Sequence, residues 1–189
     1  MGDVGAVLKQ IDAGIEASLQ RLFCLIRFPT VATDPNYHAD CHNAAVWLKQ
    51  EFEGLGFAAS IHKTTGQPVV IGKYKPEGPS DVPHVLFYGH YDVQPADPIE
   101  LWTAPPFEPR IGKGKNGQDQ IFARGSSDDK GQLMTFVEAC RGWLAAHGRL
   151  PFELTILIEG DEEGDSSHLD RFLAGNRKRG AERVATPRE

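Results

Sequence analysis

Residues 154–163 read Leu-Thr-Ile-Leu-Ile-Glu-Gly-Asp-Glu-Glu, a run of apolar and β-branched residues that leads directly into an acidic patch. Such a run is typical of a buried strand. The same order occurs twice upstream: residues 85–88 (Val-Leu-Phe-Tyr) precede His90-Tyr91-Asp92, and residues 120–123 (Gln-Ile-Phe-Ala) precede Asp128-Asp129. Ligands in open α/β sheets bind at the carboxyl ends of strands. We therefore expect the three patches to converge at one edge of a sheet.

The rest of the chain predicts helices around these strands. Apolar residues at helical spacing predict helices over residues 4–27, 38–54 and 130–147, and a shorter one near 166–174. Two further strands are expected over residues 57–62 and 69–74, and the Pro- and Gly-rich residues 94–119 are expected to form a long loop. This order of elements predicts an α/β fold with a mixed, mainly parallel sheet flanked by helices.

The composition is that of an ordinary globular protein. The 189 residues are enough for one domain with a sizeable core, and the net charge of −6 argues against a nucleic-acid partner. No apolar stretch is long enough to span a membrane, and the first residues lack the pattern of a secretory signal. Cys24, Cys41 and Cys140 lack paired spacing, which predicts reduced thiols. We therefore expect a cytoplasmic protein that binds neither nucleic acid nor membrane.

Residues 176–189 differ from the rest of the chain. They contain five basic residues against two acidic ones, and Val184 is their one large aliphatic residue. A segment of this composition cannot bury an apolar face, so we expect a basic, disordered tail.

The patch His90-Tyr91-Asp92 has the composition of a metal-binding motif. A histidine that binds a metal needs its second ring nitrogen held in place, and a carboxylate two residues further on can do this. The alternative interpretation is a core histidine beside a surface aspartate. Carboxylates that meet in one place repel one another unless cations lie between them, which favours a metal site.

The second patch, Asp128-Asp129, lies between a predicted strand and a predicted helix. Either side chain could cap the helix that begins at residue 130 by accepting hydrogen bonds from its free N–H groups. Two adjacent acids exceed what capping requires, however. One carboxylate can bridge two cations with its two oxygens while its neighbour orients it.

The paired glutamates Glu162 and Glu163 follow the third strand. A solvated acidic turn is the ordinary interpretation of such a pair. The alternative is catalytic, since one glutamate can bind a metal while the other takes a proton from the attacking water and passes it to a leaving amine.

Taken together, the patches and their surroundings resemble one family closely. The matching stretches are His-Tyr-Asp-Val-Gln-Pro at 90–95, Leu-Trp at 101–102, Pro-Pro-Phe-Glu-Pro at 105–109, Arg-Gly-Ser-Ser-Asp-Asp-Lys-Gly at 124–131 and Glu-Gly-Asp-Glu-Glu-Gly-Asp-Ser at 159–166. They resemble the co-catalytic zinc metallopeptidases, which include carnosinase-like dipeptidases, acetylornithine deacetylase and succinyl-diaminopimelate desuccinylase. The resemblance covers roughly residues 5–175, and Trp102 with Phe107 favours the dipeptidase branch.

The resemblance implies a zinc-exopeptidase-like catalytic domain with two divalent cations, zinc first and manganese or cobalt as alternatives. His90 and Asp128 would bind one cation, and Asp128 and Glu163 would bind the other. The resemblance also implies that the peptide bond between Asp128 and Asp129 is cis.

The implied reaction is hydrolysis of a small peptide by water that the metal activates. Asp92 would orient the metal-binding histidine. Glu162 would act as the general base and later as the general acid. An N-acyl-amino-acid amidohydrolase with the same site is an open alternative, because the residues that decide between peptides and acylated amino acids are expected outside this chain.

The chain also departs from the family pattern. Family members are much longer, with a further acidic ligand downstream, a histidine ligand near the C-terminus and an inserted domain used for dimerisation. We therefore expect residues 1–175 to be the N-terminal half of a catalytic domain, without the dimerisation or lid domain and with impaired turnover. The alternative is an inactive fragment that binds a partner or a full-length relative.

The other histidines are not expected to replace the missing ligands. His168 is predicted to be a surface histidine in a helix. The remaining five, which lack acidic neighbours at a strand end, are expected to be solvated or hydrogen-bonded: His38, His42, His62, His84 and His147.

Overall fold

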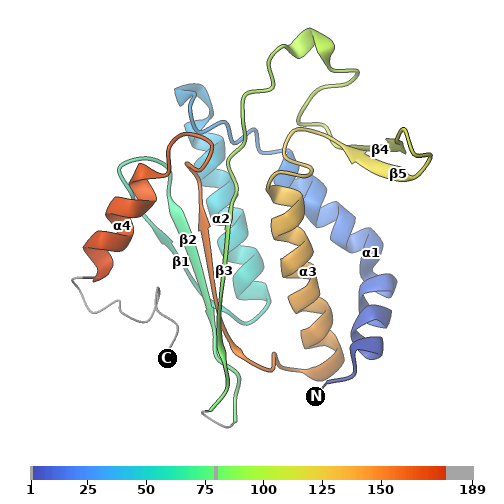
Figure 1. The fold of residues 1–189 in the computed structure, drawn as a ribbon, viewed down its shortest axis with the longest axis vertical. Helices are drawn as coiled ribbons and strands as arrows, with labels where there is room; N and C mark the ends of the chain where they lie inside the picture. The colour runs from blue at the N-terminus through green and yellow to red at the C-terminus, as the bar shows by residue number, and fades with distance from the viewer. Residues whose placement is uncertain (1, 79–80, 178–189) are drawn as a thin grey trace.

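The computed structural model describes residues 2–78 and 81–177, and its centre is a four-stranded sheet (Figure 1). The strand order is β1 (Ala58–His62), β2 (Val69–Tyr74), β6 (Glu153–Glu159) and β3 (His84–His90). β2 is antiparallel to both β1 and β6, whereas β3 and β6 are parallel. The predicted mixed α/β sheet is confirmed. The expectation of mainly parallel pairing is wrong for the described strands, because the short connection from β1 to β2 permits only an antiparallel pair.

Helices cover both faces of this sheet (Figure 1). α2 packs against β1 and β2, α3 packs against β3, and α1 packs against α3. α4 covers the opposite face, where Leu169 joins the side chains of β2 and β6. The bounds are α1 Val4–Ile26, η1 Pro35–Tyr37, α2 His38–Gly54, η2 Ile99–Leu101, α3 Lys130–His147 and α4 Ser167–Arg177.

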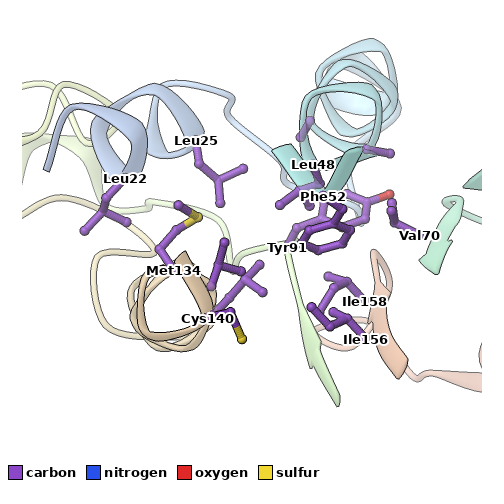
Figure 2. Close-up of a cluster of buried hydrophobic side chains, with 14 of the residues drawn as sticks. Leu22, Leu25, Leu48, Phe52, Val70, Tyr91, Met134, Cys140, Ile156 and Ile158 are labelled. Carbon is purple, nitrogen blue, oxygen red and sulfur yellow. The ribbon is translucent and has the colours of Figure 1, made fainter. Parts of the chain in front are cut away.

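The main core lies between helices α1, α2 and α3 and the face of the sheet that these helices cover. Figure 2 shows Leu48 and Phe52 of α2 opposite Ile156 and Ile158 of β6, with the Tyr91 ring between them. All five side chains are completely buried. Tyr91 stands between the two polar residues of the first patch, so the core itself fixes the backbone at that patch.

Residues 94–119, expected to form a loop, contain a strand, and the next strand along the chain is not part of the main sheet. β4 (Arg110–Lys113) pairs with β5 (Asp119–Phe122) in an isolated antiparallel hairpin. The prediction that residues 120–123 form a buried strand of the sheet is therefore wrong. Ile121 and Phe122 are half-buried and the two residues before them are exposed, so β5 is less buried than a strand inside the main sheet.

β3 is also less buried than its apolar sequence predicts. Leu86 and Tyr88 expose 49% and 47% of their surface, whereas Phe87 stacks on Phe136 of α3 with ring centroids 3.9 Å apart. The alternation arises because β3 lies at the edge of the described sheet and α3 covers only one of its faces.

Several other predictions can be compared with the structure. The predicted bounds of α2, α3 and β2 agree with those observed. All three cysteines lie in the described residues and are free. Asn176 and Arg177 belong to α4 rather than to a tail, and residues 178–189 of the predicted tail lie outside the described residues. No described helix combines the length and apolar content needed to cross a membrane.

Three helices are joined by one partly buried ionic network. Glu138 of α3 accepts hydrogen bonds from Arg21 (2.6 Å) and Ser18 (2.8 Å) of α1. Arg141 of α3 contacts Glu138 at 3.2 Å and Glu51 of α2 at 2.6 Å. Burial raises the pKa of Glu138, but its hydrogen bonds and the neighbouring arginines outweigh this effect and lower the pKa.

Glu138→Gln is expected to reduce the free energy of unfolding by about 2 kcal/mol, because the charge-assisted hydrogen bonds are lost. The lowered pKa means that this contribution is present above pH 4.5, the ordinary pKa of a glutamate, and is lost as pH falls through the folded-state pKa. Urea unfolding across this range should therefore show a smaller loss of stability with acid in the variant. Glu53→Gln, at an exposed pair with Lys49, is the control and should change stability by less than about 0.5 kcal/mol.

Candidate active site

Two of the sequence patches meet at the carboxyl ends of neighbouring strands, as expected. The parallel register places His90, the last residue of β3, beside Glu159, the last residue of β6. Residues 160–166 then turn back over His90, so that Glu162 lies 3.7 Å from the imidazole. The second patch is positioned by a helix instead. Asp128 and Asp129 precede the N-terminus of α3 and do not follow a strand of the main sheet.

His90 is surrounded by carboxylates. Its side chain is buried, with Nδ1 at 3.3 Å from Asp92 Oδ1. Its Nε2 lies 3.2 Å from Asp128 Oδ1 and 3.7 Å from Glu162 Oε2. One ring nitrogen is therefore held from inside the protein, and the other faces two partly exposed acids.

Asp92 positions both His90 and the paired glutamates. It is completely buried, and its two carboxylate oxygens accept hydrogen bonds from the backbone N–H groups of Glu162 (3.2 Å) and Glu163 (2.9 Å). The same carboxylate contacts His90 Nδ1. Asp92 thus ties the imidazole and the paired glutamates to one rigid anchor, beyond the histidine-orienting role that its position in the sequence suggested.

The peptide bond between Asp128 and Asp129 is cis, as the family resemblance implies. Asp129 is the N-cap residue of α3, but among the described residues its side chain makes no capping hydrogen bond. Its Oδ2 instead accepts the backbone N–H of His90 at 3.0 Å. The capping interpretation is therefore wrong for Asp129, which helps to fix the histidine.

Glu163 has a partner that the sequence analysis did not assign. Gln94 Nε2 donates to Glu163 Oε2 at 2.7 Å. In the sequence, Gln94 belongs to the family-like stretch that follows Asp92. Since an amide side chain can orient a carboxylate oxygen, Gln94 holds Glu163 beside the site.

The local charge acts strongly on His90. Burial lowers its pKa, but the hydrogen bond and charge of Asp92, together with the charges of Asp129 and Glu162, outweigh burial and raise the pKa to about 9. Burial raises the pKa of Asp129. The carboxylates around His90 therefore give the site a net negative charge, which favours positive charge at the imidazole.

This donor set fits a divalent cation. The carboxylates raise the pKa of His90, and a cation near Nε2 can balance the same negative charge. Asp128 exposes 73% of its side chain, so it can turn toward an ion that enters from solvent. Within residues 2–78 and 81–177, however, no group of three or more His, Cys, Asp or Glu side chains is arranged to hold a metal ion.

A second buried carboxyl group lies beside the site. Glu159 is 1% exposed, and its Oε1 accepts hydrogen bonds from the Tyr88 hydroxyl and from Ser166 (3.2 Å). Its Oε2 has no hydrogen-bond partner among the described residues. Burial raises the pKa of Glu159. Sequence analysis missed this residue because nothing in the apolar run of β6 indicates where its last side chain points.

The remaining histidines lie in the described helices and strands. His168 lies in α4, as predicted, but it is half-buried rather than on the surface, and it contacts Thr65 at 2.6 Å. His42 is exposed on α2. The other four have hydrogen-bond partners: His38 with Ala32 O, His62 with Ser60, His84 with Thr155 and His147 with Asp3 O.

Comparisons with known proteins identify the family to which this chain is similar. A model of peptidase family M20/M25/M40 matches residues 86–186. The chain is 30% identical over 169 residues to a Cys-Gly metallodipeptidase of Candida albicans, and 42% identical over 84 residues to a succinyl-diaminopimelate desuccinylase of Xylella fastidiosa. The fold superimposes on the di-peptidase Dug1p of Saccharomyces cerevisiae with a TM-score of 0.80 and 26% identity.

The two dipeptidase matches cover most of this chain, and each of the three matches covers a minor part of the relative. The Candida alignment covers 82% of this chain and 34% of that protein, and the Xylella alignment covers 44% and 21%. The yeast structure is matched over 90% of this chain and 37% of its own length. The chain thus spans about a third of the length of the dipeptidases that it matches.

Proposed function

Because the chain belongs to peptidase family M20/M25/M40, we propose that it carries the N-terminal part of a metal-dependent dipeptidase site. His90 and Asp128 are the proposed ligands of one divalent cation, and Asp128 and Glu163 those of a second. Zinc is the first choice, and manganese or cobalt also suits an imidazole with carboxylates.

One observation supports this proposal more than any other. Asp92, Asp128 and Glu162 surround a single buried imidazole, with the closest nitrogen–oxygen distances between 3.2 and 3.7 Å. Such a concentration of acids around His90 is typical of a site that binds cations. The similarity to a Cys-Gly metallodipeptidase supports dipeptides as substrates.

The protein's own groups have distinct tasks in this proposal. Divalent cations bound here would polarise the substrate carbonyl and lower the pKa of the attacking water. Glu162, 42% exposed beside His90, takes the proton of that water and later delivers it to the leaving amine. Asp92 holds His90 through Nδ1 and holds Glu162 through its backbone N–H, so the base and the ligand keep a fixed relation.

A second candidate function is supported by the similarity to the desuccinylase of Xylella, which is 42% over its 84 matched residues. Hydrolysis of an N-acyl amino acid uses the same attack on an amide carbonyl and the same proton transfer. The two candidates differ only in the groups that bind the rest of the substrate.

The test is hydrolysis of Cys-Gly and of N-succinyl-diaminopimelate by the purified chain, assayed after chelation and after addition of Zn²⁺ or Mn²⁺. We expect the rate, impaired as the sequence predicts, to disappear on chelation and to return with the cation. Calorimetric titration of the chelated protein with the same ions checks binding separately. Hydrolysis that persists unchanged after chelation, or a chain that binds neither ion, would contradict the proposal.

A further inference from the structure

We propose that the loop between β1 and β2, residues 63–68, positions the candidate site by holding both site-bearing segments at once. This inference rests on the proposed function of that site. No residue of this loop is a proposed ligand or base. Its role is to fix the segment containing His90 and the segment containing Glu162 relative to each other.

The first contact holds the His90 segment. Tyr91 is completely buried, and its hydroxyl donates to the carbonyl oxygen of Pro68 at 2.8 Å. The Tyr91 ring also lies directly beneath Gly160, where an added Cβ would come within 2.3 Å of the ring. Tyr91 therefore joins loop 63–68 to the residues on either side of it, His90 and Asp92.

The second contact holds the glutamate segment. The backbone N–H of Gln67 donates to Asp161 Oδ2 at 2.6 Å, and both residues are buried. The carbonyl oxygen of Asp161 accepts the N–H groups of Gly164, Asp165 and Ser166 at 3.1–3.2 Å, which closes the turn that carries the two glutamates. Asp161 thus transmits the position of loop 63–68 to that turn.

The loop is itself braced. Thr64 Oγ1 accepts the N–H of Gly66 at 2.9 Å and donates to the carbonyl oxygen of Gln67 at 2.7 Å. Thr65 contacts His168 of α4 at 2.6 Å. Gly66 fits because it lacks a side chain: an added Cβ would lie 2.4 Å from Asp161 Oδ2 and 2.5 Å from the His168 ring.

Gly66→Ala is the variant that tests the inference, because its methyl group must displace Asp161 and the His168 ring. Two quantities are measured. The first is hydrogen exchange at the backbone amides of Glu162 and Glu163, which donate hydrogen bonds to Asp92. The second is the affinity for Mn²⁺, measured by calorimetry. We expect exchange to accelerate about tenfold. We expect the Mn²⁺ affinity to fall by about 10–100-fold, as when a supporting group of a metal site is lost.

Two variants control this experiment, and a third tests the contact between Tyr91 and Pro68. Gly54→Ala, where a Cβ meets nothing within 4 Å among the described atoms, should change neither readout. Glu138→Gln lowers global stability far from the site, and it should leave the Mn²⁺ affinity unchanged. Tyr91→Phe removes only the hydroxyl bonded to Pro68, and it should accelerate exchange without emptying the core.

The outcomes separate the two proposals. Exchange and Mn²⁺ affinity that stay at wild-type values in both Gly66→Ala and Tyr91→Phe would overturn the positioning role. Restoration of both readouts by His168→Ala in the Gly66→Ala background would also overturn it, since the effect would then pass through α4 rather than Asp161. If the wild-type chain binds no cation, the proposed function fails, while the exchange rates still decide whether the loop orders the glutamates.

Discussion

Glu162→Gln is expected to slow dipeptide hydrolysis by about 10²–10⁴-fold, the range for loss of a general acid–base group. Glutamine keeps the shape of the side chain, and its backbone N–H can still donate a hydrogen bond to Asp92, so the turn itself should persist. It cannot take a proton from water at neutral pH. Because Glu162 is not a proposed ligand, the affinity for Zn²⁺ or Mn²⁺ should change by less than about threefold, a difference below 1 kcal/mol.

Glu163→Gln is the matched variant, since it makes the same chemical change one residue further on. Here the expected result is reversed: the affinity for the cation falls first, and the rate recovers in part when more cation is added. Initial rates at several cation concentrations, measured beside calorimetric titrations, distinguish the two variants. Equal losses of affinity in both would sink the separate roles assigned to them.

His90→Ala is expected to lower the affinity for the first cation by roughly 100-fold or more, beyond the effect of losing a supporting group. The variant removes the only imidazole among the proposed ligands, and with it the group whose positive charge balances Asp92 and Asp129. Hydrolysis should disappear with the bound cation. Calorimetry and the peptide assay measure the two effects.

His42→Ala controls for the loss of a histidine, because His42 is exposed on α2 and is not a proposed ligand. It should leave both measurements unchanged. Thermal unfolding of His90→Ala, followed by circular dichroism, separates loss of the site from loss of the fold. A folded His90→Ala protein that retains wild-type cation affinity would exclude His90 as a ligand.

The sequence predicted those parts of the fold that depend on local periodicity. Apolar residues on one face of a helix fixed the bounds of α2 and α3, and the continuous apolar run of β6 identified a strand that is buried on both faces. The convergence of His90 with Glu162 also followed, because both lie at carboxyl ends of strands in one sheet.

The sequence did not predict which strands pair with one another or which face of a strand is covered. The run at residues 120–123 has a strand-like composition, but nothing in it indicates pairing with residues 110–113 rather than with the main sheet. The exposure of Leu86 depends on α3 covering only one face of β3. Strand pairing and coverage by a helix depend on the tertiary structure, and the composition of a single strand does not record them.

The same distinction applies to the site. Residues that carry charge after a strand were found because their chemistry is visible in the sequence. Gln94, Asp161 and Glu159 were missed as supporting residues, since their importance depends on a partner far along the chain. Supporting groups of this kind are ordinary polar residues until the fold brings their partners to them.

The parallel register of β3 and β6 has a consequence for anyone who engineers this chain. Seven consecutive residue pairs, from His84 with Glu153 to His90 with Glu159, align the two strands. Adding or deleting one residue inside β3 would turn the imidazole to the other side of the sheet. The tip between β4 and β5 stands apart from that alignment, so reporter sequences and affinity tags belong there.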